Sequence, residues 1–314
     1  TVIGGFLGAG KTTLLNQLLR DPAGRRLAVL VNDFGAINID AELIESRDGE
    51  ILSLENGCIC CGVAGDFIAA LALLRDREDP PEHVIVEASG VADPGAIVAL
   101  GDMPGYRRDA AVVVADAETV RARAEDELTR HQVTGQLRAA DLIVLNKTDL
   151  VDPEHLADTH TWVREVVGPS TAIVESAFGA VPTDVVLGIT PKPTAYAGHH
   201  AEHEHEHEHE HGAPHASFDT WSWRDDAAIS GAGLVEAIKA LPSGIVRAKG
   251  LLFLREDAAH RYVMQVVGRR YSVERDRAWG DEPPASQLVI IGLPGSVDEQ
   301  QLTATLKGLT VPAA

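Results

Sequence analysis

The stretch GFLGAGKT at residues 5–12 is the strongest indication of the fold in this sequence. It fits the phosphate-binding pattern G-x-x-x-x-G-K-[ST], and it lies between a short apolar strand at residues 1–3 and a helical pattern of leucines. Glycines let the backbone fold closely around a phosphate, so that the N–H groups of residues 8–13 and a helix N-terminus face the anion. The stretch therefore predicts a P-loop nucleotide-binding domain rather than an ordinary Gly-rich turn that opens a helix.

The side chains of this loop have separate expected roles. Lys11 is expected to reach the β- and γ-phosphates, and the Thr12 hydroxyl is expected to bind Mg²⁺. Lys11 and Thr12, together with Glu87, are the catalytic candidates. The predicted phosphate-binding residues are Gly8, Ala9, Gly10, Lys11, Thr12 and Thr13.

Strand and helix patterns alternate after the loop, which predicts an α/β fold with a doubly wound, mostly parallel sheet of the P-loop NTPase type. An amphipathic helix is expected where Phe67, Ile68, Leu71 and Leu74 recur, and one long polar helix is expected through residues 121–136. Apolar runs predict buried strands at residues 27–31, 51–54, 84–87, 110–115, 142–145 and 171–175.

The strand at residues 84–87 ends in an acid. Glu87 begins an E-x-x-G pattern that ends at Gly90. In P-loop enzymes an acid at this place supports Mg²⁺, and the glycine N–H senses the γ-phosphate. Four residues mean little alone, and the pattern gains its weight from lying on the expected strand after the P-loop.

A second strand end carries the sequence Asn146-Lys147-Thr148-Asp149. The Asp149 carboxylate can accept hydrogen bonds from N1–H and the 2-amino group of guanine, which adenine does not offer. Asn146 and Lys147 are expected to brace the base and the P-loop. A backbone N–H of the pair Ser176-Ala177 is expected to contact the guanine oxygen, so Ser176 joins the predicted nucleotide-binding residues. The pattern predicts GTP and GDP as ligands, not ATP.

All the cysteines of the chain lie in the loop at residues 57–62, as Cys58, Cys60 and Cys61. An odd number without spaced partners argues against disulfides and for a reducing compartment, where thiolates serve as soft metal ligands. The alternative is that small buried cysteines fill a core, but three of them between two glycines are typical of a loop. The loop lies between the P-loop and the E-x-x-G segment, so its metal affinity is expected to depend on the nucleotide.

Composition limits the class of protein. The chain has 314 residues, 45% of them hydrophobic, and a formal net charge of −20, which argues against nucleic acid as a partner. Because no apolar run approaches about 18 residues and no signal peptide is evident, we expect a cytoplasmic protein with no membrane partner, either a monomer or a weak dimer. The chain begins at Thr1, so a few natural N-terminal residues are expected to be absent from it.

The segments GGFLGAGKTT, GCICC, EASGVADP and NKTD occur in an order that resembles the CobW family of metal-handling GTPases. The resemblance implies a metallochaperone with Zn²⁺ or Co²⁺ on the three cysteines of the C-x-C-C motif and GTP hydrolysis as the switch. It also implies Mg²⁺ on Thr12 with Glu87 in support, and guanine on Asn146, Lys147 and Asp149.

One departure from the family pattern concerns the loop after the strand at residues 27–31. Some relatives carry glutamates where this chain has Val31 and Ala36, so extra carboxylate metal ligands are not transferred here. Metal ligation by Asp33, Asp40 or Glu42 stays open.

The region after Pro191 changes character. Histidine and glutamate alternate there, no apolar face can form, and a mobile linker is expected. Its candidates for weak metal binding are His199, His200, His203, His205, His207, His209 and His211. The alternative is a solvated spacer whose repeat expanded. We expect a P-loop GTPase domain at 1–194, the linker at 195–217 and a CobW-type C-terminal domain at 218–314.

The C-terminal pattern predicts a smaller α+β domain, and PSGIVRAKGLLFL and SQLVIIGL resemble the CobW C-terminal domain. Strands are expected at 218–223, 245–253, 262–267, 271–273 and 287–291, and helices at 233–241 and 297–306. Trp221, Trp223 and Trp279 are interpreted as half-buried packing rather than a partner surface.

Together these patterns predict a metallochaperone that uses GTP, Mg²⁺ and Zn²⁺ or Co²⁺ and delivers metal to a client metalloprotein. Two alternatives stay open. One is cobalt handling for cobalamin synthesis or nitrile hydratase activation, and the other is a metal store that acts through the histidine-rich linker.

Overall fold

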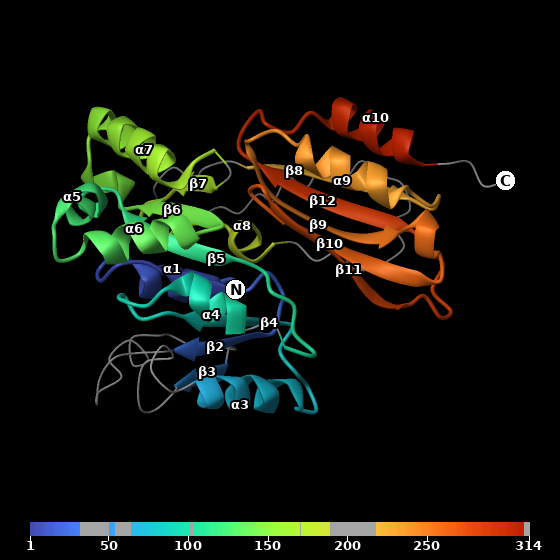
Figure 1. Ribbon diagram of the computed structural model, residues 1–314, viewed down its shortest axis with the longest axis horizontal. Helices are drawn as coiled ribbons and strands as arrows, with labels where there is room; N and C mark the ends of the chain where they lie inside the picture. Colours follow the sequence, from blue (N-terminus) through green and yellow to red (C-terminus); the bar gives the residue numbers. More distant parts are fainter. Residues whose placement is uncertain (32–49, 54–63, 101–102, 170, 189–217, 311–314) are drawn as a thin grey trace.

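The computed structural model describes residues 1–31, 50–53, 64–100, 103–169, 171–188 and 218–310. Figure 1 shows two bodies, each built on its own sheet, with the parallel sheet in blue and green and the antiparallel sheet in orange. Within these ranges no helix has both the length and the apolar character that crossing a bilayer requires.

The first sheet is parallel throughout its described part, with the strand order β3-β2-β4-β1-β5-β6-β7. Its strands are β1 (Val2–Gly4), β2 (Leu27–Val31), β3 (Glu50–Ser53), β4 (His83–Glu87), β5 (Ala111–Asp116), β6 (Leu142–Asn146) and β7 (Ala172–Glu175). The apolar runs predicted these strands to within two residues. The short β1 lies between β4 and β5, and this places the P-loop in the middle of the carboxyl edge.

Helices cover both faces of this sheet, as a doubly wound fold requires. On one face α1 (Lys11–Arg20) and α8 (Thr183–Leu187) pack against alternate strand residues such as Ile3. On the other face, α3 (Ala64–Arg75), α4 (Pro94–Leu100), α6 (Arg130–Ala139) and α7 (Pro153–Val167) contact the intervening residues. The α/β prediction is confirmed.

The polar helix expected through residues 121–136 was predicted wrongly. Two helices, α5 (Val120–Glu125) and α6, replace it. The break has a local cause, because Asp126 Oδ1 accepts a hydrogen bond from Leu128 N at 2.7 Å and Thr129 Oγ1 donates to Arg123 O at 2.6 Å. Such side-chain bonds compete with the helical backbone pattern and end the helix.

The apolar stripe of α3 also differs in one position from expectation. Phe67, Leu71 and Leu74 are buried as predicted, but Ile68 is 43% exposed and Leu73 is 70% exposed. Two large apolar side chains in the described part of this helix therefore face solvent, and the helix is less amphipathic than its sequence spacing indicated.

The second sheet is antiparallel, with the order β11-β10-β9-β12-β8. Helices α9 (Gly231–Lys239) and α10 (Glu299–Leu309) pack on one of its faces over a core that contains Trp221, Trp223 and Met264. Its strands are β8 (Asp219–Asp225), β9 (Ile245–Phe253), β10 (His260–Val267), β11 (Arg270–Ala278) and β12 (Ser286–Gly292). The α+β prediction for this part is confirmed.

The tryptophans lie in the core, as the packing interpretation predicted. Trp221, Trp223 and Trp279 are each less than a tenth exposed, and the Trp279 ring meets the Phe253 ring edge-on, with centroids 6.1 Å apart. Strand β11 runs five residues past the expected end, because its charged half pairs with β10 through contacts such as Arg261 Nη2 to Asp276 Oδ2 at 2.5 Å.

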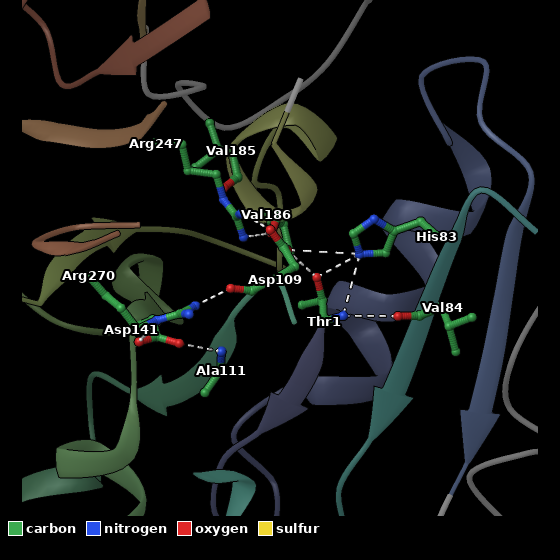
Figure 2. A network of polar contacts seen from close by, with 10 residues as sticks. All are labelled: Thr1, His83, Val84, Asp109, Ala111, Asp141, Val185, Val186, Arg247 and Arg270. Carbon is green, nitrogen blue, oxygen red and sulfur yellow. Dashed lines mark hydrogen bonds and ion pairs between the residues drawn. The ribbon is translucent and has the colours of Figure 1, made fainter. Parts of the chain in front are cut away.

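The C-terminal domain packs against the amino edge of the parallel sheet, where β5 and β6 begin (Figures 1 and 2). Arg247 of β9 is 3% exposed, and its Nη1 donates to Asp109 Oδ1 at 2.8 Å. Its Nε donates to Val185 O at 2.6 Å, and its Nη2 donates to Val186 O at the end of α8. One guanidinium thus joins β9, α8 and the start of β5.

A second arginine fixes the same interface. Arg270 Nε donates to Asp141 Oδ1 at 2.6 Å, and its Nη2 donates to Asp109 O. Asp141 Oδ2 in turn accepts from Ala111 N at 2.8 Å, so the starts of β5 and β6 are held together (Figure 2). Val246 of the C-terminal domain joins the apolar core under α1, which makes the two domains one packed unit.

Candidate functional site

The P-loop connects β1 to α1, and its backbone requires glycine at several points. Gly5, Gly8 and Gly10 have φ values of 134°, 79° and 106°, a region that L side chains rarely adopt. A Cβ on Gly5 would lie 2.2 Å from Val114 O, and one on Gly10 would lie 2.3 Å from Asn146 Nδ2. The loop is therefore pressed against the sheet, and a side chain at either position has no room.

The backbone of the loop shows which donors are directed inward. Ala9 N donates to Phe6 O at 3.1 Å, so this N–H closes the loop on itself. The first turn of α1 follows at once, and the N–H groups of a first helical turn have no acceptor inside their own helix. The Lys11 side chain is only 8% exposed at this turn.

Thr12 and Glu87 meet as the two motifs predicted. The Thr12 hydroxyl donates to Glu87 Oε1 at 3.2 Å, and Glu87, at the end of β4, is 2% exposed. A hydroxyl and a buried carboxylate next to a phosphate loop form the hard oxygen donor set that Mg²⁺ prefers. The residues present therefore fit this ion.

Gly90 of the E-x-x-G segment touches the P-loop. A Cβ on Gly90 would lie 3.0 Å from Leu7 N and 2.6 Å from Leu7 Cδ2. The segment is held by Gln136 of α6, whose Nε2 donates to Gly90 O at 3.0 Å and to Ala92 O at 2.9 Å. The sequence analysis did not predict a role for Gln136. The feature that could have indicated one is a polar amide on the apolar stripe of α6, near Val133.

Asn146 joins three loops at the same edge. Its Nδ2 donates to Ala9 O of the P-loop at 3.0 Å, and its Oδ1 accepts from Gly179 N at 2.9 Å. The residue is 2% exposed at the end of β6. The amide therefore ties the phosphate loop to the loop after β7, the bracing role expected of it.

Lys147 has an unexpected partner. Its Nζ lies 2.7 Å from Asp116 Oδ2, and its backbone has a φ of 63°. Asp116 ends β5 and also accepts from Glu118 N at 2.9 Å. Glu87 became a candidate site residue because it is an acid at the end of a buried apolar strand. Asp116 has the same position at the end of β5, so the same pattern makes it a candidate.

The guanine motif and the loop after β7 are joined through Ser176. Thr148 donates twice to Ser176 O, from its N and its Oγ1, each at 3.1 Å. Ser176 N donates to Leu145 O at 2.8 Å inside the sheet, so this N–H already has a backbone acceptor. Asp149 is exposed in a short 3-10 turn next to this loop.

Several predicted residues lie outside the described ranges: Cys58, Cys60, Cys61, Asp33, Asp40, Glu42 and the histidines at 199–211. The residues that the structure describes contain no group of three or more His, Cys, Asp or Glu arranged to hold a metal ion. The chain enters residues 54–63 from the carboxyl end of β3, on the edge that carries the P-loop.

The fold and the loops at its carboxyl edge define a P-loop nucleoside triphosphatase. Two family models then identify the chain. The "CobW/HypB/UreG, nucleotide-binding domain" matches residues 1–175, and the "Cobalamin synthesis protein cobW C-terminal domain" matches residues 218–310. The chain therefore belongs to the CobW family of P-loop GTPases.

Three curated relatives show the range of the similarity. The chain is 34% identical over 342 residues to "Zinc chaperone CobW" of Sinorhizobium sp, covering 98% of this chain and 96% of the relative. It is 28% identical to "Zinc chaperone YjiA" of Escherichia coli (strain K12), covering 98% of each. It is 32% identical to "Zinc-regulated GTPase metalloprotein activator 1" of Schizosaccharomyces pombe, covering 57% of this chain and 46% of that one.

Proposed function

We propose that this protein is a GTP-hydrolysing metallochaperone that binds Zn²⁺ or Co²⁺ through Cys58, Cys60 and Cys61 and delivers it to a client metalloprotein. The observation that carries the proposal is the assembly of the P-loop, Glu87–Gly90 and Asn146–Asp149 around one edge of the sheet. The chain enters the cysteine loop from that same edge. The names of the relatives, which are two zinc chaperones and a zinc-regulated GTPase metalloprotein activator, support the metal half of the proposal.

The nucleotide half of the proposal assigns a task to each group. Lys11 and the first turn of α1 bind the phosphates, and Thr12 with Glu87 holds Mg²⁺, which neutralises the charge of the β- and γ-phosphates when bound. Gly90 lies against the P-loop at Leu7, which supports the proposed role of its N–H as the group that responds to the γ-phosphate. Asp149 selects guanine, and the Ala177 N–H contacts the guanine oxygen.

The metal half rests on donor chemistry. Three thiolates suit Zn²⁺ or Co²⁺, and they leave the fourth tetrahedral position for water or for a ligand of the client. An open position suits the transfer of metal to another protein. The proposed coupling is that GTP orders the loop between β3 and α3 and gathers the thiolates, whereas hydrolysis loosens it.

The test measures Zn²⁺ affinity in the presence of a non-hydrolysable GTP analogue and in the presence of GDP, with a competing chelator as the reference. We expect tighter Zn²⁺ binding with the analogue, and equal Zn²⁺ affinities would contradict the proposed coupling. Cys60→Ala should weaken metal binding and leave GDP affinity within about twofold, because thiolate ligands are not phosphate ligands. Loss of both affinities in this variant would indicate that the cysteine loop is structural.

The histidine-rich segment supports a second candidate, a metal store. Histidine at every second position with glutamate between is suited to several weakly held ions. Stoichiometry separates the two functions, because one tight ion lost with the cysteines supports the chaperone. Several weaker ions lost on deletion of residues 195–217 support the store. Cobalt handling is distinguished by metal analysis of the protein purified from zinc-limited and zinc-replete cells, with identification of the co-purifying client.

A further inference from the structure

Phe178 lies in the loop between β7 and α8, and its ring is exposed where its backbone is strained. The residue is 63% exposed and has a φ of 54°, a region that costs an L residue about 1–2 kcal/mol. Its neighbours in the chain are buried against α1, among them Val181 and Val185. An aromatic side chain that is held in such a backbone and contributes little to its own core points to a contact with a ligand.

The loop is fixed on both sides of Phe178 by the predicted guanine motif. On one side Ser176 O accepts two hydrogen bonds from Thr148, and on the other Gly179 N donates to Asn146 Oδ1 at 2.9 Å. Gly179 is also pressed against α1, because a Cβ there would lie 2.8 Å from Leu14 N. The strain at Phe178 is therefore set by contacts with the nucleotide edge.

Lys147, on the facing loop, shares this feature. Lys147 has a φ of 63°, and its ammonium lies 2.7 Å from Asp116 Oδ2. Asp149, two residues further on, is exposed and is the proposed base-selecting group. Two non-glycine residues with positive φ thus occur on the two loops that border the expected base position. Both loops are joined by the bonds from Thr148 to Ser176.

We propose that Phe178 covers the guanine ring and holds it by stacking, while Asp149 chooses the base. This inference rests on the proposed GTP site. Stacking on an aromatic ring depends little on the edge groups of the base, because every base offers a π-face. Phe178 therefore contributes affinity for guanine and hypoxanthine nucleotides alike, and the discrimination between them belongs to Asp149.

The experiment measures GDP and inosine diphosphate affinities by calorimetry for the full chain and for Phe178→Ala. We expect both affinities to fall about 10- to 100-fold, with their ratio unchanged. Phe178→Trp should restore GDP affinity to within about threefold, because indole also stacks. The matched control is Leu128→Ala, which removes a side chain that is 90% exposed in the turn between α5 and α6 and should change neither affinity.

Phe178→Gly separates ligand contact from a structural role. Glycine adopts a φ of 54° without strain, so the thermal unfolding midpoint without nucleotide should not fall, while GDP affinity should fall as in the alanine variant. A lower midpoint together with weaker binding would overturn the inference in favour of a structural role. Unchanged GDP affinity in Phe178→Ala would also overturn it, whereas failure of the unaltered chain to bind GDP would contradict the proposed function itself.

Discussion

At the scale of the residue, the nucleotide edge depends on side chains that each serve two loops. Asn146 is the clearest case, since its amide holds both the P-loop and the loop after β7. Both partners are backbone groups in a buried environment, where an unsatisfied N–H costs about 1–3 kcal/mol. Asn146 therefore stabilises the fold and shapes the site at once.

Asn146→Ala is expected to lose both contributions. The free energy of unfolding should fall by about 1–3 kcal/mol, since Gly179 N is left without its acceptor, and GDP affinity should fall at least about tenfold. Urea unfolding and calorimetry measure the two effects. Gln132→Ala on the exposed side of α6 is the control, and an Asn146 variant of unaltered stability would contradict the bracing role.

Asp149→Asn is expected to change which base the protein prefers rather than to abolish nucleotide binding. An asparagine cannot accept two hydrogen bonds from guanine, but its amide can donate to the 2-oxo group of xanthine. GTP hydrolysis at low nucleotide concentration should fall more than about 100-fold, and xanthosine triphosphate should become the better substrate. Because Asp149 is exposed, the unfolding midpoint should not change, and a variant that still prefers GTP would rule out this role.

The sequence motifs pointed to individual residues of the nucleotide edge, but they did not predict which residues those side chains contact. Glu87, Asn146 and Lys147 were singled out because each lies in a short pattern at a strand end. Asp116 and Gln136 were missed because their contacts come from other loops, and no local pattern contains both members of such a pair. The sequence shows a polar residue in a buried stripe, but it does not show the chain segment that lies opposite.

At the scale of the element, the packing of the loop after β7 against α1 gives a direct test. A Cβ at Gly179 would lie 2.8 Å from Leu14 N and 3.0 Å from Leu14 Cα, and the φ of Gly179 is 66°. Gly280, after β11, has a φ of 61° but nothing within 4 Å of its Cβ position. The two glycines share a positive φ and differ in their surroundings.

Gly179→Ala should therefore be more damaging than Gly280→Ala. Both variants carry the strain of positive φ, about 1–2 kcal/mol, but only Gly179→Ala forces α1 and the loop apart. We expect a larger loss of unfolding free energy and weaker GDP binding in Gly179→Ala alone. Chemical denaturation and GDP titration of the pair measure this, and equal effects would show that the contact with α1 is unimportant.

Element boundaries were predicted where burial alone determined them. The strands of the parallel sheet are continuous apolar runs, and their limits followed from that pattern. The break between α5 and α6 depends on side-chain bonds of Asp126 and Thr129, and the charged half of β11 depends on cross-strand ion pairs. Neither changes the apolar periodicity, so neither was visible in it.

At the scale of the whole molecule, the two domains are joined by buried charge. Asp109 is 6% exposed, and although burial alone raises the pKa of its carboxyl, the charge of Arg247 prevails and lowers that pKa below its usual range. A carboxylate with a lowered pKa stabilises the folded state above the pKa of the unfolded chain, near 3.9, and this contribution disappears as the pH falls below about 4.

Asp109→Asn should thus destabilise the protein in a pH-dependent manner. At pH 7 the free energy of unfolding should fall by about 3–5 kcal/mol, because Arg247 stays buried without its counter-charge. The difference from the unaltered chain should shrink as the pH falls from about 5 to about 3. Glu125→Gln, an exposed acid paired with Arg121, is the control, and a pH-independent difference would refute the assignment.

The domain interface was not predicted, since the sequence offered only two separate patterns and a linker between them. Arg247 lies within an apolar strand pattern, and no local feature indicates that its partners are Asp109 and the carbonyls at the end of α8. Contacts between residues more than a hundred positions apart are set by docking, which the local pattern does not encode.

The position of this interface has a consequence for biosynthesis. The contacts described for the nucleotide edge come from residues 5–179. The arginines that bind the amino edge, Arg247 and Arg270, come later in the chain. A ribosome releases the first group before it makes the second. Until then Asp109 and the α8 carbonyls are without their arginine partners, so the contacts of the nucleotide edge can form before the C-terminal domain docks at the far edge.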